Sequence, residues 1–177
     1  MPSDLKSFDA PAAFEERLSQ RLSALASAHD VLARQEWRGA DLDSVLKGQL
    51  RHHLDTYGDR IEVVGEPCDL PPEAAHYVGL ALHELGSNAV KHGALAAPNG
   101  KVTIAWRVRR EPDGDSLELS WIESGAGPVV APERTGFGAV MLRSLVASAV
   151  KGRAEMIFGE SGLTWTLTAP LTAPGAA

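Results

Sequence analysis

The sequence is poor in several features that mark particular classes of protein. It has one cysteine, Cys68, in 177 residues, which excludes a disulfide framework and a thiolate metal site. It has no run of about 18 apolar residues, so we expect no membrane-spanning segment in this chain. Its N-terminus lacks the apolar stretch of a signal peptide. We therefore expect a soluble, cytoplasmic chain from a reducing compartment.

Positive charge is also scarce. The chain has 17 Lys and Arg against 23 Asp and Glu, a net charge of −6. A protein that binds the nucleic-acid backbone needs a basic patch, and none is visible, which argues against a nucleic-acid partner. The hydrophobic content of 44% and the charged content of 23% are ordinary for a globular protein. The length is sufficient for one full domain and an appendage.

The first 57 residues are predicted to form two helices. Within residues 11–34, leucines recur every seventh position, which predicts a helix whose seam packs against a partner helix in the same chain or in a second copy. These residues are Leu18, Leu25 and Leu32. Asp41 is placed to cap a second helix that ends near Gly58.

Beyond Gly58 the pattern changes to one of mixed strands and helices. A strand is predicted over residues 60–64, a turn over 67–72 and a long helix over 72–92. The alternation of apolar and polar residues then predicts a hairpin around Pro112-Asp113-Gly114. A glycine-rich loop (123–138), a helix (140–150) and a second hairpin (154–158 with 163–168) follow, and the last six residues are predicted to form a disordered tail.

The predicted helix over residues 72–92 carries the most informative motif, His83-Glu84-Leu85-Gly86-Ser87-Asn88-Ala89-Val90-Lys91-His92-Gly93. Glu84, Asn88 and Lys91 are spaced by four and three residues, so they share one helix face. This set suits a metal-bound polyphosphate, because an amide oxygen ligates Mg²⁺, an acid holds a water or takes a proton, and a lysine meets phosphate oxygens. On spacing alone, the alternative is a solvated polar face.

The glycine-rich loop is the second indication of function. A strand that ends in Trp121-Ile122-Glu123 runs into Ser124-Gly125-Ala126-Gly127, and Gly136-Phe137-Gly138 opens the next helix. Glycines let a backbone approach a ligand closely, and free amides at a helix start bind anions. A carboxylate at a strand end is well placed to accept a hydrogen bond from the exocyclic amine of adenine. Alone, this loop is also compatible with a surface turn; together with the helix motif it predicts a nucleotide pocket.

These motifs together resemble the C-terminal part of histidine kinases of the HWE family, within the GHKL superfamily of Bergerat-fold ATPases. The helix motif, the Trp-x-Glu feature and the Gly-Phe-Gly motif match the family nearly position for position. The earlier segment that contains His29-Asp30 and Trp37-x-Gly39-Ala40 resembles the family's second dimerisation helix and its exit. The similarity extends over about residues 8–171.

The resemblance implies an α/β (α+β) fold, a two-layer sandwich of a mixed sheet and helices, preceded by a helical segment from a dimerisation domain. It divides the chain into that segment (1–57), an ATP-binding catalytic domain (58–171) and a tail (172–177). Family members carry their acceptor histidine in an earlier His-Arg-x-Lys-Asn helix, and none of the six histidines here has that pattern. We therefore expect a fragment of a longer sensor kinase without its acceptor helix. His29 is the alternative acceptor, although the family has a His-Asp pair at this place in addition to its acceptor.

Residue by residue, the resemblance implies that Asn88 ligates Mg²⁺ and that Glu84 orients or deprotonates the phosphoryl acceptor, with His83 and Lys91 also catalytic. Glu123 would hold the adenine amine, in the place where other GHKL proteins use aspartate. The other nucleotide-binding residues implied are Gly125, Gly127, Gly136, Phe137, Gly138 and Thr164, the last one residue out of the family's register.

The expected function is that of a kinase that binds Mg-ATP and transfers the γ-phosphoryl to a histidine in a two-component signalling pathway. Its expected partners are the receiver domain of a response regulator and a second copy bound through the N-terminal helices. The alternatives are a non-catalytic GHKL-like phosphotransfer or partner-binding adaptor, and a kinase acting on a serine of a regulatory partner. The intact Glu84, Asn88 and glycine loop argue against the adaptor. The Trp121-Ile122-Glu123 and His29-Asp30 context favours histidine over serine.

Overall fold

The structure is a computed structural model that describes residues 40–128 and 136–171. The predicted first helix with its leucine seam, His29 and the predicted tail lie outside the described residues. Within the described part, no helix is both long and apolar enough to cross a lipid bilayer.

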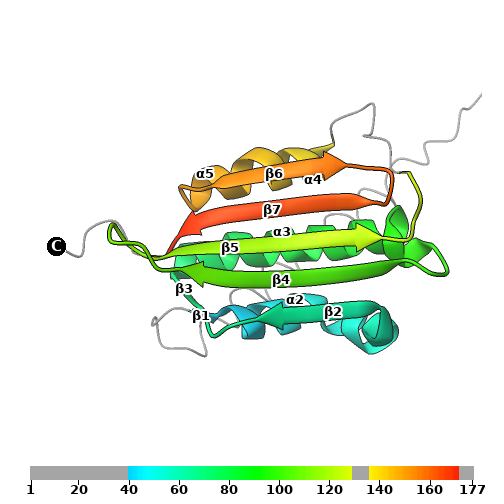
Figure 1. The fold of residues 1–177 in the computed structure, drawn as a ribbon, viewed down its shortest axis with the longest axis horizontal. Coiled ribbons are helices and arrows are strands. Elements are labelled where there is room, and N and C mark those ends of the chain that lie inside the picture. The colour runs from blue at the N-terminus through cyan, green and yellow to red at the C-terminus, as the bar shows by residue number, and fades with distance from the viewer. Residues whose placement is uncertain (1–39, 129–135, 172–177) are drawn as a thin grey trace, which may run out of the picture.

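A five-stranded mixed sheet forms one layer of the molecule (Figure 1). Its strands lie in the order β2-β4-β5-β7-β6, with β2 parallel to β4 and every other pair antiparallel. The strands are β2 (Ile61–Gly65), β4 (Lys101–Arg109), β5 (Ser116–Ser124), β6 (Arg153–Phe158) and β7 (Leu163–Pro170). Both predicted hairpins, β4–β5 and β6–β7, are confirmed.

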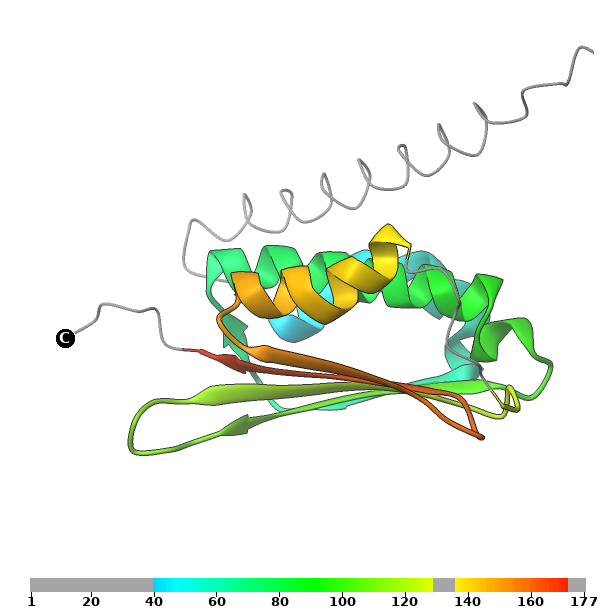
Figure 2. The same cartoon turned by 90° about the horizontal axis from the view of Figure 1, so that it is seen from above.

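The helices form the second layer and cover one face of the sheet (Figure 2). They are α2 (Leu42–Tyr57), α3 (Pro72–Lys91) and a third helix assembled from α4 (Phe137–Val140), η3 (Met141–Leu145) and α5 (Val146–Ala149). The η3 segment has π geometry, which occurs inside helices as short insertions, often beside functional sites. The predicted two-layer α/β class is confirmed.

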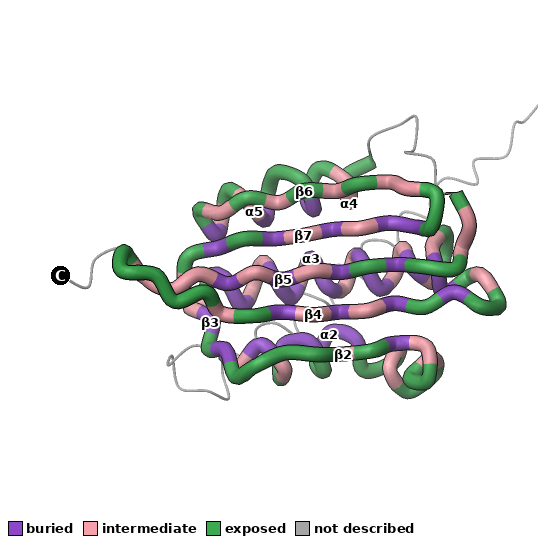
Figure 3. The backbone as a smooth tube through the Cα atoms, viewed as in Figure 1, coloured by how far each residue is buried: buried purple, intermediate pink, exposed green. Residues whose placement is uncertain are grey.

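Side-chain alternation explains why the sheet is covered on one face only. Along β5, Leu117, Leu119, Trp121 and Glu123 are buried while their neighbours are partly or fully exposed (Figure 3). Successive residues of a strand point to opposite faces, so one row meets the helices and the other meets solvent. On the helix side, the core residues of α3 include Val78, Leu82, Leu85 and Ala89, which recur at helical spacing and form an apolar face.

Helix α2 packs into this same core. Its N-terminus is capped by Asp41, whose side chain accepts a hydrogen bond from the Ser44 amide at 3.0 Å. Its buried residues belong to the same apolar cluster as α3 and the sheet; they include Leu42, Val45, Leu46 and Leu50. Helix α2, α3 and the sheet therefore share one apolar core in the described part of the chain, and the division at residues 57 and 58 stays a prediction.

The predicted turn over residues 67–72 contains a short strand. Residues Asp69–Leu70 form β3, which pairs antiparallel with β1 (Ala40–Asp41). The amide of Leu42 also donates to the carbonyl of Cys68 at 2.9 Å. A two-residue strand is too short to show any alternation, so periodicity did not reveal it.

Strand β4 extends beyond its parallel neighbour. β2 pairs with β4 only as far as Gly65 and Trp106. Past that point, Glu66 Oε1 accepts a hydrogen bond from the Val108 amide at 2.6 Å, and the Glu66 carbonyl accepts one from Trp106 Nε1 at 2.8 Å. Glu66 thus takes the place that a longer β2 would have filled.

Candidate nucleotide site

A cavity of about 340 Å³ lies where α3, the start of α4 and the ends of β5, β6 and β7 meet. Its size falls in the range of small-molecule sites. It combines two carboxylates and an amide with an apolar wall, a set that can hold a metal-bound phosphate through the amide and a base against the apolar side chains. It is lined by Glu84, Asn88, His92, Gly93, Glu123, Gly136, Gly138, Ala139, Leu142, Met156, Phe158 and Leu163.

Helix α3 supplies the first pair of polar groups. Glu84 and Asn88 lie one turn apart and both line the cavity. Asn88 Nδ2 donates to Glu84 Oε1 at 3.3 Å. This contact turns the amide nitrogen toward the carboxylate and leaves the amide oxygen as the group suited to a hard cation.

Strand β5 supplies a buried carboxylate. Glu123 is 2% exposed, and both of its oxygens accept hydrogen bonds: Oε2 from the Ala94 amide at 2.7 Å and Oε1 from Trp121 Nε1 at 3.0 Å. Burial raises the pKa of Glu123, and these two hydrogen bonds oppose the rise because they stabilise the charged form. A β-carbon at Gly93 would collide with Glu123 Oε2, so the motif's glycine makes room for this acid.

The start of α4 packs against the Glu84 side chain. A β-carbon at Gly138 would collide with Glu84 Oε1, which explains the second glycine of Gly136-Phe137-Gly138. Gly136 and Gly138 line the cavity. Phe137 is 56% exposed and is not among the lining residues.

His83 is half-buried on α3 and lies outside the cavity lining. Burial lowers its pKa, with the Lys91 cation adding to the effect and the Glu84 carboxylate opposing it. On α2, the pKa of His53 is lowered by burial, and His83 and His52 lower it further. A β-carbon at Gly86, three residues after His83, would lie 3.4 Å from His53 Cε1, so this side of α3 faces α2.

The remaining predicted site residues are not among those that line the cavity. Lys91 is exposed at the last position of α3. Gly125 and Gly127 have φ angles of 77° and 81°, the left-handed region that favours glycine, and neither lines the cavity. Thr164 is not brought into the cavity: on β7 it alternates with the buried Leu163, which is the residue that lines the wall.

Several lining residues were not predicted from the sequence. His92 and Gly93 fall within the helix motif but received no role, although the motif places them one turn past Asn88. Met156, Phe158 and Leu163 are inward positions of a predicted hairpin, and alternation alone marks them as buried without showing that a cavity lies against them.

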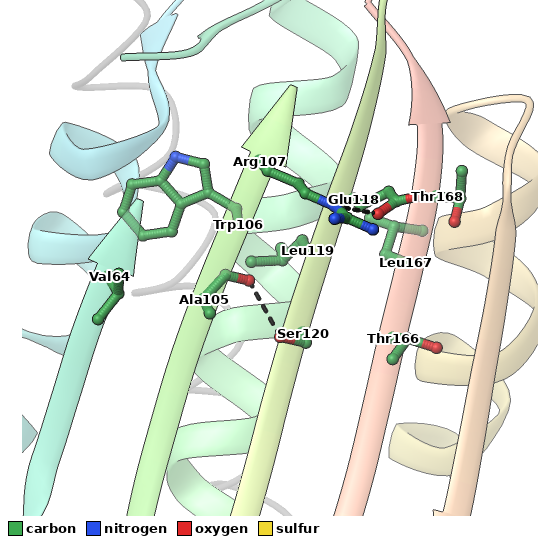
Figure 4. A pocket seen from close by; sticks show the side chains of 10 residues that line it. All are labelled: Val64, Ala105, Trp106, Arg107, Glu118, Leu119, Ser120, Thr166, Leu167 and Thr168. Atoms are coloured by element: carbon green, nitrogen blue, oxygen red, sulfur yellow. Dashed lines mark hydrogen bonds and ion pairs between the residues drawn. The ribbon is translucent and has the colours of Figure 1, made fainter. Parts of the chain in front are cut away.

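A second cavity, of about 450 Å³, lies on the open face of the sheet (Figure 4). Its charged groups are paired with one another, because Glu118 forms ion pairs with both Arg107 and Arg109. The remaining outward groups are small or neutral, such as Ala105, Ser120 and Thr166. This arrangement leaves little charge for a ligand, so the cavity beside α3 is the stronger candidate.

The described fold matches that of histidine kinase catalytic domains. The chain superposes on the blue-light-activated histidine kinase EL346 of Erythrobacter litoralis with a TM-score of 0.67 and 19% identity, over 94% of this chain and 52% of that one. The separate kinase domain of that protein gives a TM-score of 0.62 and 20% identity, over 87% of this chain and 74% of that domain. The histidine kinase ThkA, in complex with the response regulator protein TrrA, superposes with a TM-score of 0.53 and 15% identity, over 95% of this chain and 53% of that one.

Sequence comparison narrows the class to a family. Residues 3–67 match the family described as HWE histidine kinase. A blue-light-activated histidine kinase of Brucella anthropi is 33% identical over 163 residues, 92% of this chain and 33% of that protein. The protein of the same description from Brucella ovis is 33% identical over 154 residues, which are 87% of this chain and 32% of that protein. The chain belongs to the HWE histidine kinase family, and it spans about a third of the length of these curated relatives.

Proposed function

We propose that the chain binds Mg-ATP in the cavity beside α3 and transfers the γ-phosphoryl group to a histidine of a two-component signalling protein. The observation that carries the proposal is that one cavity collects Glu84, Asn88 and Glu123 from two separate elements. Phosphoryl transfer asks mainly for positioning and charge neutralisation, and these three groups supply distinct parts of that task.

The donor set fits a magnesium ion. The described residues hold no cluster of three or more His, Cys, Asp or Glu side chains that would bind a metal by themselves. Mg²⁺ in phosphoryl-transfer sites commonly takes only one or two protein oxygens and completes its shell with water and phosphate oxygens. The Asn88 amide oxygen would be such a ligand, and the bound ion would neutralise phosphate charge.

The residues of the chain then divide the work. Glu123 accepts a hydrogen bond from the adenine amine. Glu84 faces the phosphoryl acceptor and takes the proton that the imidazole loses as its nitrogen bonds to the γ-phosphorus and ADP leaves. Lys91 meets the phosphate oxygens, and Gly136 and Gly138 let the backbone close over them. His83, between α2 and α3, supports the helix face that presents Glu84.

Calorimetry tests the binding step. Wild type should bind ATP more tightly with Mg²⁺ than with a chelator. Asn88→Ala should lose at least the roughly tenfold affinity that removal of even an outer-shell partner costs at metal sites. The control is internal: without Mg²⁺ the two proteins should bind ATP alike. Equal binding by both in the presence of Mg²⁺ would contradict the role of Asn88, and no binding by wild type would favour the adaptor.

A transfer assay tests the chemistry. A peptide carrying a His-Arg-x-Lys-Asn helix is added with ATP labelled at the γ-phosphate, and acid-labile, base-stable label is counted. Glu84→Gln should keep ATP binding and abolish transfer. Glu73→Gln, the same change on the exposed first turn of α3, should leave transfer unchanged. Label on serine, which is stable to acid, would favour the serine kinase, and label on His29 without added peptide would make His29 the acceptor.

The proposed partners follow from the same function. A receiver domain would take the phosphoryl group from the histidine, and a second copy would pair through the N-terminal helices. Size-exclusion chromatography with light scattering measures the second, because a monomer at micromolar concentration would contradict it.

A further inference from the structure

Arg60 is joined by several hydrogen bonds to a single loop of backbone. It is the last residue of η1 (Gly58–Arg60), directly before β2. Its Nε donates to the Gly100 carbonyl at 2.8 Å, and its Nη2 donates to the carbonyls of Ala94 at 3.0 Å and Ala97 at 2.6 Å. All three acceptors belong to residues 92–100, which connect α3 to β4 and are called here the α3–β4 loop.

The α3–β4 loop is held by short-range backbone hydrogen bonds and by the burial of Ala94 and Leu95. Its only helical turn among the described residues is η2 (Ala94–Ala96). The carbonyls of Ala94 and Ala97 each already accept one amide within the loop, at 3.1 and 3.3 Å. Arg60 therefore occupies the second lone pair of each and ties both to Gly100.

This loop in turn contacts the candidate site. The Ala94 amide donates to Glu123 Oε2 at 2.7 Å, and Gly93 lies against the same oxygen. A β-carbon at Gly125, just past the end of β5, would lie 2.8 Å from the Asn99 carbonyl oxygen and 3.2 Å from Gly100 Cα. The loop thus supplies one of the two hydrogen bonds that orient the Glu123 carboxylate, and Trp121 supplies the other.

We propose that Arg60 is a positioning residue for adenine recognition: it fixes the α3–β4 loop so that the Ala94 amide holds the Glu123 carboxylate toward the cavity. The inference rests on the proposed role of Glu123 as the acceptor for the adenine amine. Arg60 itself is not among the residues that line the cavity. The planar guanidinium suits this role because its fork reaches several carbonyls at fixed angles, whereas a lysine ammonium is a single point of charge.

The proposal predicts an effect on the pH profile of binding. The Ala94 hydrogen bond opposes the rise in the pKa of Glu123 that burial causes. If the loop loosens, that opposition weakens and the pKa rises further. The carboxylate then protonates at a higher pH, and ADP affinity begins to fall at a higher pH. Glu84 and His92 are the other titratable groups that line the cavity, and both are unchanged in the variants.

The experiment compares Arg60→Gln, Arg60→Lys and Arg107→Gln with wild type. Displacement of a fluorescent nucleotide by ADP and by GDP is measured between pH 5.5 and 8, with thermal melts to confirm folding. Arg60→Gln should weaken ADP binding roughly three- to tenfold, lower the ADP-to-GDP selectivity and move the acid limb to higher pH. Arg60→Lys keeps the charge and should show the same changes in smaller measure, which covers a failure of Arg60→Gln to fold. Arg107→Gln loses an arginine of the open sheet face and should match wild type.

Glu123→Gln distinguishes a failure of the Arg60 proposal from a failure of the proposed adenine role of Glu123. If Glu123→Gln changes the selectivity while both Arg60 variants keep the wild-type selectivity and pH profile, the inference about Arg60 is wrong and the nucleotide site stands. A lower melting temperature with unchanged selectivity counts as that result, because it shows a merely structural role. If Glu123→Gln also leaves the selectivity unchanged, the adenine role of Glu123 is wrong and the inference fails with it.

Discussion

Glu123 is a buried carboxylate whose two hydrogen bonds come from groups that are themselves held in place. A carboxylate only accepts hydrogen bonds, so it pairs with the adenine amine and is repelled by the guanine carbonyl. ADP should therefore displace a fluorescent nucleotide far better than GDP. Glu123→Ala should narrow that difference by about 1–3 kcal/mol, roughly five- to 150-fold, the cost of an unpaired buried polar group.

Glu118→Ala is the matched control for Glu123→Ala. Glu118 lies on the same strand, pairs with arginines on the open face and should leave base selectivity at the wild-type level. Equal displacement by ADP and GDP in the wild-type protein would show that Glu123 does not select the base.

At the scale of single residues, the sequence could predict the part of the site that helix geometry fixes. Glu84 and Asn88 share a face because they are four residues apart, and the structure brings both into one cavity. In a strand, an error of one residue in the alignment moves the predicted side chain to the opposite face of the sheet. Thr164 consequently points away while Leu163 lines the wall. Arg60 was missed because its partners are backbone carbonyls about 40 residues away, and no side-chain motif records them.

At the scale of elements, the contact between α2 and α3 depends on two glycines of α3. A β-carbon at Gly79 would meet its neighbours at 3.5 Å, an ordinary contact, whereas one at Gly86 would lie 2.7 Å from Leu50 Cδ2. Gly79→Ala should raise the free energy of unfolding by about 0.5–1 kcal/mol, because alanine loses less backbone entropy in a helix. Gly86→Ala should show no gain or a loss. Urea unfolding of both variants measures the difference, and equal gains would mean that α2 and α3 are not closely packed at Gly86.

The same helix contact should make stability depend on pH. The Nδ1 atom of His53 is buried without a hydrogen-bond partner, and burial lowers the pKa of His53 below its ordinary value of 6.5. Between the folded pKa and 6.5 the unfolded chain binds a proton that the folded chain resists, so the free energy of unfolding falls as the pH falls through that window. His53→Leu should flatten the loss between pH 7.5 and 5.5.

His52→Leu, on the exposed side of α2, is the control for His53→Leu. The raised pKa of Glu123 has the opposite sign, because a carboxyl protonated in the folded state adds stability as the pH falls. The difference between each variant and wild type removes that contribution. An unchanged slope in His53→Leu would place the pH dependence elsewhere.

The elements themselves were largely predictable where they carry a period. The residues of β4 and β5 alternate over nine positions, and α3 repeats its apolar arc over 20. The pairing of β1 with β3 and the π geometry of η3 were not predicted, because two residues show no period and a π turn leaves no mark on the apolar spacing. The inclusion of α2 in the core also required the structure, since a helix pattern does not say which neighbour it packs against.

At the scale of the whole molecule, Cys68 offers a probe of global opening. It is the only cysteine of the chain and is 4% exposed. Burial, together with the carboxylates of Asp69, Asp41 and Glu66, raises the pKa of its thiol to about 11. An aromatic disulfide reagent should therefore react at pH 8 only with molecules that have opened.

Mg-ATP bound in the proposed site, whose lining does not include Cys68, should slow that reaction. A ligand that binds only the folded state lowers the population of opened molecules by a factor of one plus the ratio of its concentration to its dissociation constant, so ATP at 100 times its dissociation constant should slow the reaction about a hundredfold. Mg²⁺ alone should have no effect, and Asn88→Ala should lose most of the protection. A rate that ATP leaves unchanged would mean that Cys68 is exposed by local opening, or that the nucleotide does not bind.

The end of β4 that extends beyond its pairing with β2 affects whether two copies of the chain can associate through their sheets. An unpaired strand segment is a template on which a second chain adds a strand, and this is how many sheets begin to aggregate. The Glu66 carboxylate accepts a hydrogen bond from the Val108 amide, and the Glu66 carbonyl accepts one from the Trp106 indole. A negative charge therefore stands at the position that an incoming backbone carbonyl would need. The sheet thereby discourages its own extension at that edge.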